Sequence, residues 1–267
     1  MASIPGLEQE SSPLGGLEKV EDIVAVTSGK GGVGKSTTTV SLAYGLQSLG
    51  YKVGIADCDI YGASIPSIIG LKDQPEIGED QTLIPPSKDG IPVLSMGLLL
   101  NEQDIPVVWR GPMLHKMISQ FLFGAKWGEL DFLLLDLPPG TGDVQLTLTQ
   151  SVPLTGALVV TTPQKISLLD AEKGVAMFHQ FGIRVLGILE NMSYLICPHC
   201  GDREELFPHG GVEDLAKQYH TEVIGRIPMS PEIARIMEEN PFLKKENSSL
   251  IQAYLKVCQE ISEKLKT

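Results

Sequence analysis

The sequence is poor in basic residues and has no long hydrophobic run. Lysine and arginine number 21 against 33 aspartates and glutamates, which gives a formal net charge of −12. Because an acidic chain repels nucleic acid and anionic lipid, neither is expected as a partner. No apolar run approaches the roughly 18 residues of a membrane-spanning helix, so no membrane association is expected.

Arginine is missing from the first part of the chain, and cysteine is scarce throughout. No arginine precedes Arg110, and residues 1–20 lack a charged stretch followed by an apolar one. These features argue against a secretory signal and an arginine-rich transit peptide, so we expect a cytoplasmic protein. We interpret residues 1–20 as a flexible lead. Four cysteines in 267 residues do not suggest a disulfide scaffold.

Beyond that lead, short apolar runs alternate with amphipathic stretches of helix length. The runs rich in Val, Ile and Leu are expected as buried strands at 23–27, 52–57, 132–136, 157–161, 184–191 and 222–227. Alternation of strands and helices predicts an α/β fold with a doubly wound, mostly parallel sheet flanked by helices. No linker divides the chain, so residues 21–267 are expected to form a single domain.

Three further segments have local signals. Ser167 stands three residues before Asp170, a capping-box spacing, and predicts a helix from Ser167 to Phe181. The region 72–92 is rich in Pro, Asp and Gly and is expected to be a surface loop. Residues 248–265 are expected to form a final surface helix.

The residues from Gly29 to Ser36 match the phosphate-loop motif G-x-x-x-x-G-K-[ST]. The motif stands between an expected strand and an expected helix, which is the context it requires. Lys35 is expected to contact the β- and γ-phosphates, and the Ser36 hydroxyl to bind Mg²⁺. The alternative is a glycine-rich turn without a ligand. The expected phosphate-loop residues are Gly29, Lys30, Gly31, Gly32, Val33, Gly34, Lys35, Ser36 and Thr37.

Aspartates follow two of the expected strands. Asp57 and Asp59 end one strand and Asp136 ends another, which places them at the carboxyl edge of the sheet, where ligands bind. Asp136 is expected to act on Mg²⁺ through water, as a Walker B carboxylate does, and Asp57 is expected as a further Mg²⁺ ligand. Alternatively, such aspartates cap helices.

The stretch "SGKGGVGKSTTT", residues 28–39, contains a second lysine, Lys30. It resembles the deviant Walker A loop of the class that contains MinD, ParA and the nitrogenase iron protein. The resemblance implies that Lys30 reaches across a homodimer to the nucleotide of the other subunit, where a cation stabilises the transferred phosphoryl group as an arginine finger does. The alternative is a solvated loop lysine.

Further segments are similar to the Mrp/ApbC family of ATP-binding iron–sulfur cluster carriers, over about Glu21 to Asn240. The resemblance implies a slow ATPase that takes a [4Fe–4S] cluster from donors and transfers it to apoproteins. It also implies that Asp59 positions the attacking water and that Asn191 reads adenine. The segments are "DCDIYGASIPSIIG" (57–70), "WRGPMLHKMISQFL" (109–122), "LDLPPGTGD" (135–143), "ENMSYLICPHCG" (190–201) and "IPMSPEI" (227–233).

Cys197-Pro198-His199-Cys200 is a single CxxC motif, which alone is a weak signal. A thioredoxin-like pair would begin a helix, whereas a glycine and a charged loop follow here. Zinc needs two more ligands, and His209 is too near for the usual finger spacing, but zinc stays an alternative. The family resemblance implies that Cys197 and Cys200 of two subunits together hold the [4Fe–4S] cluster.

Cys58 and Cys258 have no plausible spacing to this pair and are expected to be buried structural residues. Two other functions compete with the cluster carrier. One is a MinD/ParA-like positioning ATPase with a structural zinc at the CxxC motif. For this function a basic amphipathic tail would be expected in the sequence. The other is an electron-transfer reductase like the nitrogenase iron protein, whose cysteines would be spaced far apart.

Overall fold

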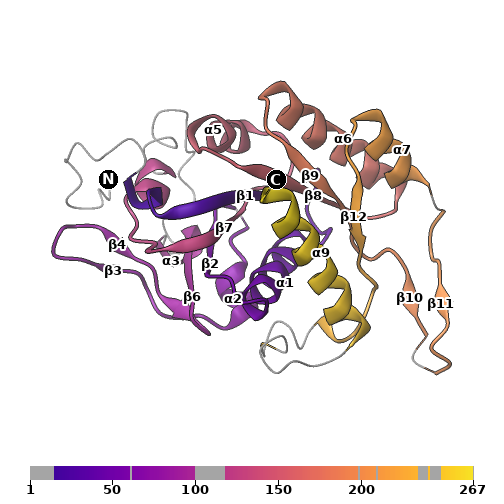
Figure 1. Ribbon diagram of the computed structural model, residues 1–267, viewed down its shortest axis with the longest axis horizontal. Coiled ribbons are helices and arrows are strands. Elements are labelled where there is room, and N and C mark those ends of the chain that lie inside the picture. Colours follow the sequence, from indigo (N-terminus) through magenta and orange to yellow (C-terminus); the bar gives the residue numbers. More distant parts are fainter. Residues whose placement is uncertain are drawn as a thin grey trace.

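The computed structural model describes residues 15–60, 62–99, 118–197, 199–208, 210–233, 240 and 248–266. Eight strands form the main sheet in the order β12-β9-β8-β1-β7-β2-β6-β5 (Figure 1). All neighbours are parallel except β5 and β6. The strands are β1 (Val20–Ser28), β2 (Val53–Asp57), β5 (Ser87–Lys88), β6 (Ile91–Ser95), β7 (Leu130–Asp136), β8 (Gly156–Thr161), β9 (Val185–Glu190) and β12 (Val223–Arg226).

Helices cover both faces of this sheet, which confirms the predicted doubly wound α/β fold. Side chains of β1 alternate between the faces: Val24 and Val26 belong to the core under α1 and α9, and Ile23 and Ala25 to the core under α6. Burial on both sides explains why the strands read as continuous apolar runs. The helices are α1 (Lys35–Ser48), α2 (Ile65–Ile69), α3 (Met96–Leu99), α5 (Asp143–Ser151), α6 (Lys165–Gln180), α7 (Gly211–Gln218) and α9 (Ser249–Leu265).

The region 72–92 contains more regular structure than a surface loop. Two short strands, β3 (Glu76–Ile77) and β4 (Leu83–Ile84), form a hairpin there, and β5 and the start of β6 follow. Leu83 and Ile91 are buried. Most of the region is exposed, as predicted, but the loop prediction was wrong for these short strands, because strands of two residues are too short to give a recognisable pattern. Pro92 is tolerated since its neighbour β5, the edge strand, is only two residues long.

The predicted capping box at Ser167 is also wrong. Helix α6 begins at Lys165, with Gln164 as its N-cap residue and no side-chain capping bond. Ser167 lies inside the first turn, where its Oγ accepts a hydrogen bond from Thr162 Oγ1 at 2.7 Å. A side-chain bond to the loop residue five positions earlier has therefore replaced the predicted cap.

The last helix is where the sequence placed it, and one of its faces belongs to the core. Leu250, Tyr254 and Cys258 of α9 are fully buried among residues of α1. The Cys258 thiol donates a weak hydrogen bond to Leu42 O at 3.6 Å. Ser248 caps the helix by accepting a bond from Ile251 N. Cys58 is buried as well, so both expected structural cysteines are confirmed as buried.

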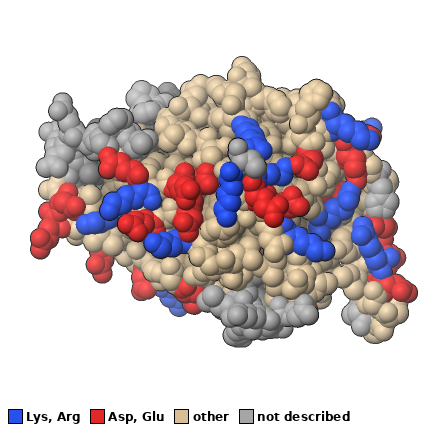
Figure 2. All heavy atoms as spheres, in the orientation of Figure 1, with Lys and Arg blue, Asp and Glu red and all other residues tan. Residues whose placement is uncertain are grey.

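Some expectations fall partly outside the described residues. These include residues 109–117 of the family-like segments, Tyr61, Pro198 and His209. Of the expected lead, residues 15–20 are described: Gly15–Leu17 form a 3₁₀ turn, Leu17 is buried, and Val20 begins β1. On the face shown in Figure 2, basic side chains are interspersed with acidic ones.

Candidate functional site

The predicted site residues gather at the carboxyl edge of the sheet because five neighbouring parallel strands end there. Asp57 ends β2 and Asp136 ends β7, and the two residues are paired in register. The phosphate loop follows β1, which lies between β7 and β8. Asn191 follows β9, the next strand along. Residues far apart in the sequence thus form one site, as expected for a doubly wound sheet.

The glycine-rich loop joins β1 directly to α1. Gly32 and Gly34 have φ values of +81° and +85°, which side chains with a Cβ rarely adopt. A Cβ added to Gly29 would lie 2.1 Å from Asp170 C in α6, so this glycine allows close packing of the loop on that helix. The backbone amides of the loop therefore lie next to the amino terminus of α1, where phosphate binding is favourable.

Lys35, Ser36 and Thr39 of α1 all contact the carboxylate of Asp136. Lys35 Nζ and Ser36 Oγ each lie 2.6 Å from Asp136 Oδ2, and Thr39 Oγ1 donates to Asp136 Oδ1 at 2.7 Å. Asp136 is fully buried and Lys35 nearly so. The predicted Walker A and Walker B residues therefore meet. Sequence reasoning missed Thr39, whose only signal is its position one helical turn after Lys35.

The other two aspartates surround this pair. Asp57 Oδ2 accepts hydrogen bonds from Ser95 Oγ at 2.9 Å and from Ile65 N at 3.2 Å. Burial, reinforced by the negative charge of Asp136, raises the pKa of Asp57 to about 7. Asp59 Oδ2 lies 3.7 Å from Lys35 Nζ. Burial also raises the pKa of Asp59, although the charge of Lys35 opposes the shift.

Lys30 and Asn191 take different positions at the loop. Lys30 is half-buried, and its ammonium group makes no ion pair or hydrogen bond with the part of the chain that the structure describes. Its backbone carbonyl accepts a bond from Ser28 Oγ. The buried Asn191 instead donates from Nδ2 to Val33 O at 2.8 Å. The adenine-reading role of Asn191 and the trans role of Lys30 stay predictions.

The CxxC motif lies on a separate hairpin. Its strands, β10 (Leu195–Ile196) and β11 (Arg203–Glu204), extend away from the main sheet (Figure 1). Cys200 is exposed and Cys197 half-exposed. Backbone N–H groups of Cys200 and His199 donate to the Cys197 sulfur and lower the pKa of this thiol. Among the described residues, no group of three or more His, Cys, Asp and Glu is arranged to hold a metal ion.

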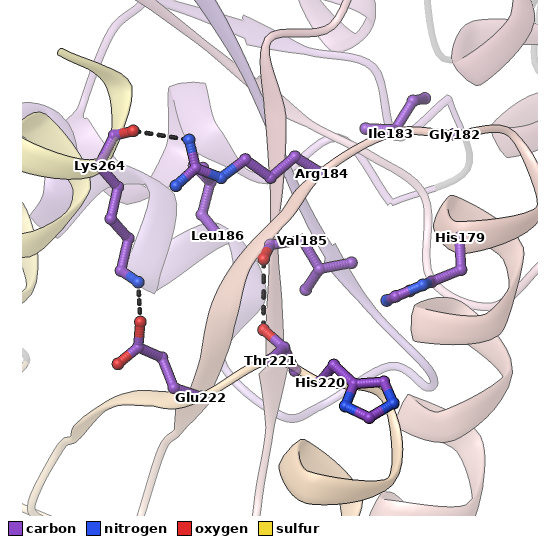
Figure 3. A pocket seen from close by; sticks show the side chains of 10 residues that line it. All are labelled: His179, Gly182, Ile183, Arg184, Val185, Leu186, His220, Thr221, Glu222 and Lys264. Atoms are coloured by element: carbon purple, nitrogen blue, oxygen red, sulfur yellow. Dashed lines mark hydrogen bonds and ion pairs between the residues drawn. The ribbon is translucent and has the colours of Figure 1, made fainter. Parts of the chain in front are cut away.

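A pocket of about 520 Å³ lies at the opposite edge of the sheet, near the amino ends of β9 and β12 (Figure 3). Arg184 Nη1 donates to Lys264 O at 2.8 Å, and Lys264 forms an ion pair with Glu222. These contacts join the end of α9 to the sheet. None of the predicted site residues lines this pocket.

The fold and the loop geometry define the protein as a P-loop nucleotide-binding protein. Residues 19–262 match the ParA family described as NUBPL iron-transfer P-loop NTPase. The chain belongs to this family. The family resemblance seen in the sequence is thereby confirmed.

Individual relatives agree with this assignment. The chain is 47% identical over 247 residues to an iron-sulfur cluster carrier protein of Aquifex aeolicus. The matched residues make up 91% of this chain and 68% of the relative. A nucleotide-binding protein of Archaeoglobus fulgidus, solved with ADP, is 40% identical with a TM-score of 0.75, covering 86% of this chain and 91% of that one. The cell-division ATPase MinD of Pyrococcus furiosus shares the fold, with a TM-score of 0.67 at 23% identity. The match covers 91% of this chain and 99% of MinD.

None of the helices in the described part of the chain combines the length and the apolar character needed to cross a membrane.

Proposed function

We propose that the protein is a homodimeric, Mg²⁺-dependent ATPase that hydrolyses ATP slowly and carries a [4Fe–4S] cluster to apoproteins. The observation that carries the proposal is the hairpin with Cys197 and Cys200, combined with a nucleotide site in the same chain. The relative named as an iron-sulfur cluster carrier protein supports an iron–sulfur cluster as the cargo. The relative solved with ADP supports nucleotide binding.

The cysteine pair fits a cluster that is held and then released. Backbone amides that point at the Cys197 sulfur favour the thiolate, which is the form that binds iron. Two thiols per chain complete a four-thiolate set only when two chains meet. The hairpin projects from the sheet (Figure 1), and Cys200 is exposed and Cys197 half-exposed, so an acceptor protein could reach the sulfurs.

The nucleotide site fits Mg²⁺ and ATP. Lys35 and Ser36 now share Asp136, and ATP binding would transfer Lys35 to the phosphates and Ser36 to Mg²⁺. Asp136 would then accept hydrogen bonds from water on the ion, and Asp57 would add a further carboxylate. The ion supplies charge neutralisation at the phosphate oxygens. Asp59, held 3.7 Å from Lys35, is placed to orient the attacking water.

The test is anaerobic reconstitution with iron and sulfide, followed by metal analysis, Mössbauer spectroscopy and transfer to an apoprotein. We expect one [4Fe–4S] cluster per dimer. Cys197→Ser and Cys200→Ser should each lose the cluster and keep ATP binding. Cys58→Ser and Cys258→Ser are the matched controls, because both thiols are buried away from the hairpin.

One tightly held zinc per monomer, with no iron uptake, would contradict the carrier function. That result would leave a zinc-stabilised positioning ATPase, since a tetrahedral zinc site also accepts thiolates.

A further inference from the structure

One short segment of chain joins the phosphate loop to the CxxC hairpin. Asn191 contacts the loop, and Cys197 follows it by only six positions. The segment leaves the end of β9 and runs into β10. The two ends of the segment thus lie at the two proposed sites, and the contacts along it determine whether a change at one end reaches the other.

At the loop end, Asn191 has little freedom to move. Its Nδ2 donates to Val33 O, and its backbone N–H donates to Thr161 O at 2.7 Å. A Cβ added to Gly34 would lie only 2.3 Å from Asn191 Nδ2. A displacement of the loop backbone therefore presses on Asn191 or breaks its bond to Val33.

At the hairpin end, the segment is tied to the chain that follows β12. Ser193 N donates to Ile227 O at 2.9 Å, and Met229 N donates to Tyr194 O at 2.7 Å. Leu195, the first residue of β10, forms a parallel bridge with Met229. A shift of residues 193–195 would therefore also move the base of the hairpin.

Directly before Asn191, the carboxylate of Glu190 connects β9, β12 and residue 193 of the segment. Glu190 ends β9 and is paired in register with Arg226, which ends β12. Its Oε2 accepts bonds from Arg226 Nε at 3.0 Å and from Ser193 Oγ at 2.8 Å. Arg226 also forms an ion pair with Glu213 of α7. Since Glu190 is buried, these bonds fix the segment more firmly than an exposed pair would.

The structure shows the phosphate site in one arrangement, and a bound ligand would have to replace its contacts. In this structure Lys35 and Ser36 both contact Asp136, which closes the phosphate site on itself. Phosphate and Mg²⁺ compete for the same two side chains, so their binding replaces these contacts. Because Gly34 directly precedes Lys35, a shift of Lys35 and Ser36 would also move the loop at Val33 and Gly34, which lies against Asn191.

We propose that Glu190, Ser193 and Arg226 are positioning residues that couple the phosphate loop to the hairpin, so that nucleotide binding alters the accessibility of Cys197 and Cys200. This coupling rests on the proposed function, in which the loop binds nucleotide and the hairpin binds the cargo. It is reciprocal: a cargo on the hairpin changes the affinity for nucleotide by the same factor.

The experiment measures thiol reactivity in the metal-free protein, so its result does not depend on iron uptake. Iodoacetamide alkylation is followed for each cysteine by peptide mass spectrometry, with and without Mg²⁺ and a non-hydrolysable ATP analogue. We expect the analogue to change the rates at Cys197 and Cys200 by about fivefold or more, the range of ordinary allosteric coupling. The buried Cys58 and Cys258 should stay unreactive and report that the protein is folded.

Glu190→Gln and Ser193→Ala should reduce that effect to less than about twofold, as expected when a coupling element is lost. Both variants should still bind the analogue, which calorimetry measures. Glu222→Gln is the matched control, because Glu222 pairs with Lys264 at the opposite edge of the sheet (Figure 3) and should keep the full effect. If Cys58 or Cys258 becomes reactive in Glu190→Gln, that variant is misfolded. The milder Ser193→Ala variant then tests the coupling.

Equal rates with and without bound analogue in the wild-type protein would overturn the coupling. So would an unchanged nucleotide effect in folded Ser193→Ala. A normal thiol response in a protein that takes up no iron would reject only the cluster-carrier function, so the two failures are distinguishable.

Discussion

Replacing Lys35 by methionine should destabilise the nucleotide-free protein as well as abolish nucleotide binding. Lys35 Nζ lies 2.6 Å from Asp136 and 3.7 Å from Asp59, and its charge also opposes the raised pKa of Asp57. One buried cation thus faces three carboxylates. Methionine retains most of the side-chain length and removes the charge.

The size of the effect follows from the burial of the pair. Lys35 and Asp136 have side chains 6% and 0% exposed, so water cannot solvate the carboxylate that is left. Breaking a buried ion pair by removing one partner typically costs about 3–5 kcal/mol, and we expect this loss in the free energy of unfolding at pH 8. The cost should be smaller at pH 5.5. Without Lys35 the pKa values of Asp57 and Asp59 rise further, so the folded variant takes up protons as the pH falls.

The assay is urea unfolding of the nucleotide-free protein at both pH values. Lys52→Met is the matched control, because the Lys52–Glu129 pair has side chains 63% and 70% exposed. Exposed pairs contribute about 0–1 kcal/mol, so this variant should be close to wild type. A cost for Lys35→Met of less than about 1 kcal/mol at pH 8, or an equal cost at both pH values, would refute the reasoning.

Three further predictions concern the same site. Asp59→Ala should bind ATP normally, by calorimetry, and lose turnover; hydrolysis at the wild-type rate would show that Asp59 does not orient water. Mixed dimers of inactive Lys30→Ala and inactive Asp59→Ala chains should regain part of the ATPase activity, because one of their two sites has both residues; no recovery after proven subunit exchange would count against a trans lysine. Because the pKa of Asp57 is raised to about 7 in the folded protein, its contribution to stability is complete below about pH 4 and is lost as the pH rises through 7. Urea unfolding of Asp57→Asn should therefore show a flatter pH profile than wild type.

The sequence by itself determined the features that depend on neighbouring residues. A strand buried on both faces must be apolar along its whole length, so β1, β7 and β8 were recognisable from continuous runs. The phosphate loop is one contiguous motif, and two of its glycines, Gly32 and Gly34, have left-handed φ values. The aspartates at strand ends were predictable because the carboxyl ends of parallel strands meet at one edge.

Only the tertiary structure decided which distant residues touch. The contacts of Thr39 with Asp136 and of Asn191 with Val33 span 97 and 158 positions, and no local pattern announces them. Strand order decided that β9 and β12 are neighbours, and therefore that Glu190 meets Arg226. Local signals are set by the backbone geometry of a few consecutive residues, whereas these contacts depend on how the strands are ordered in the sheet.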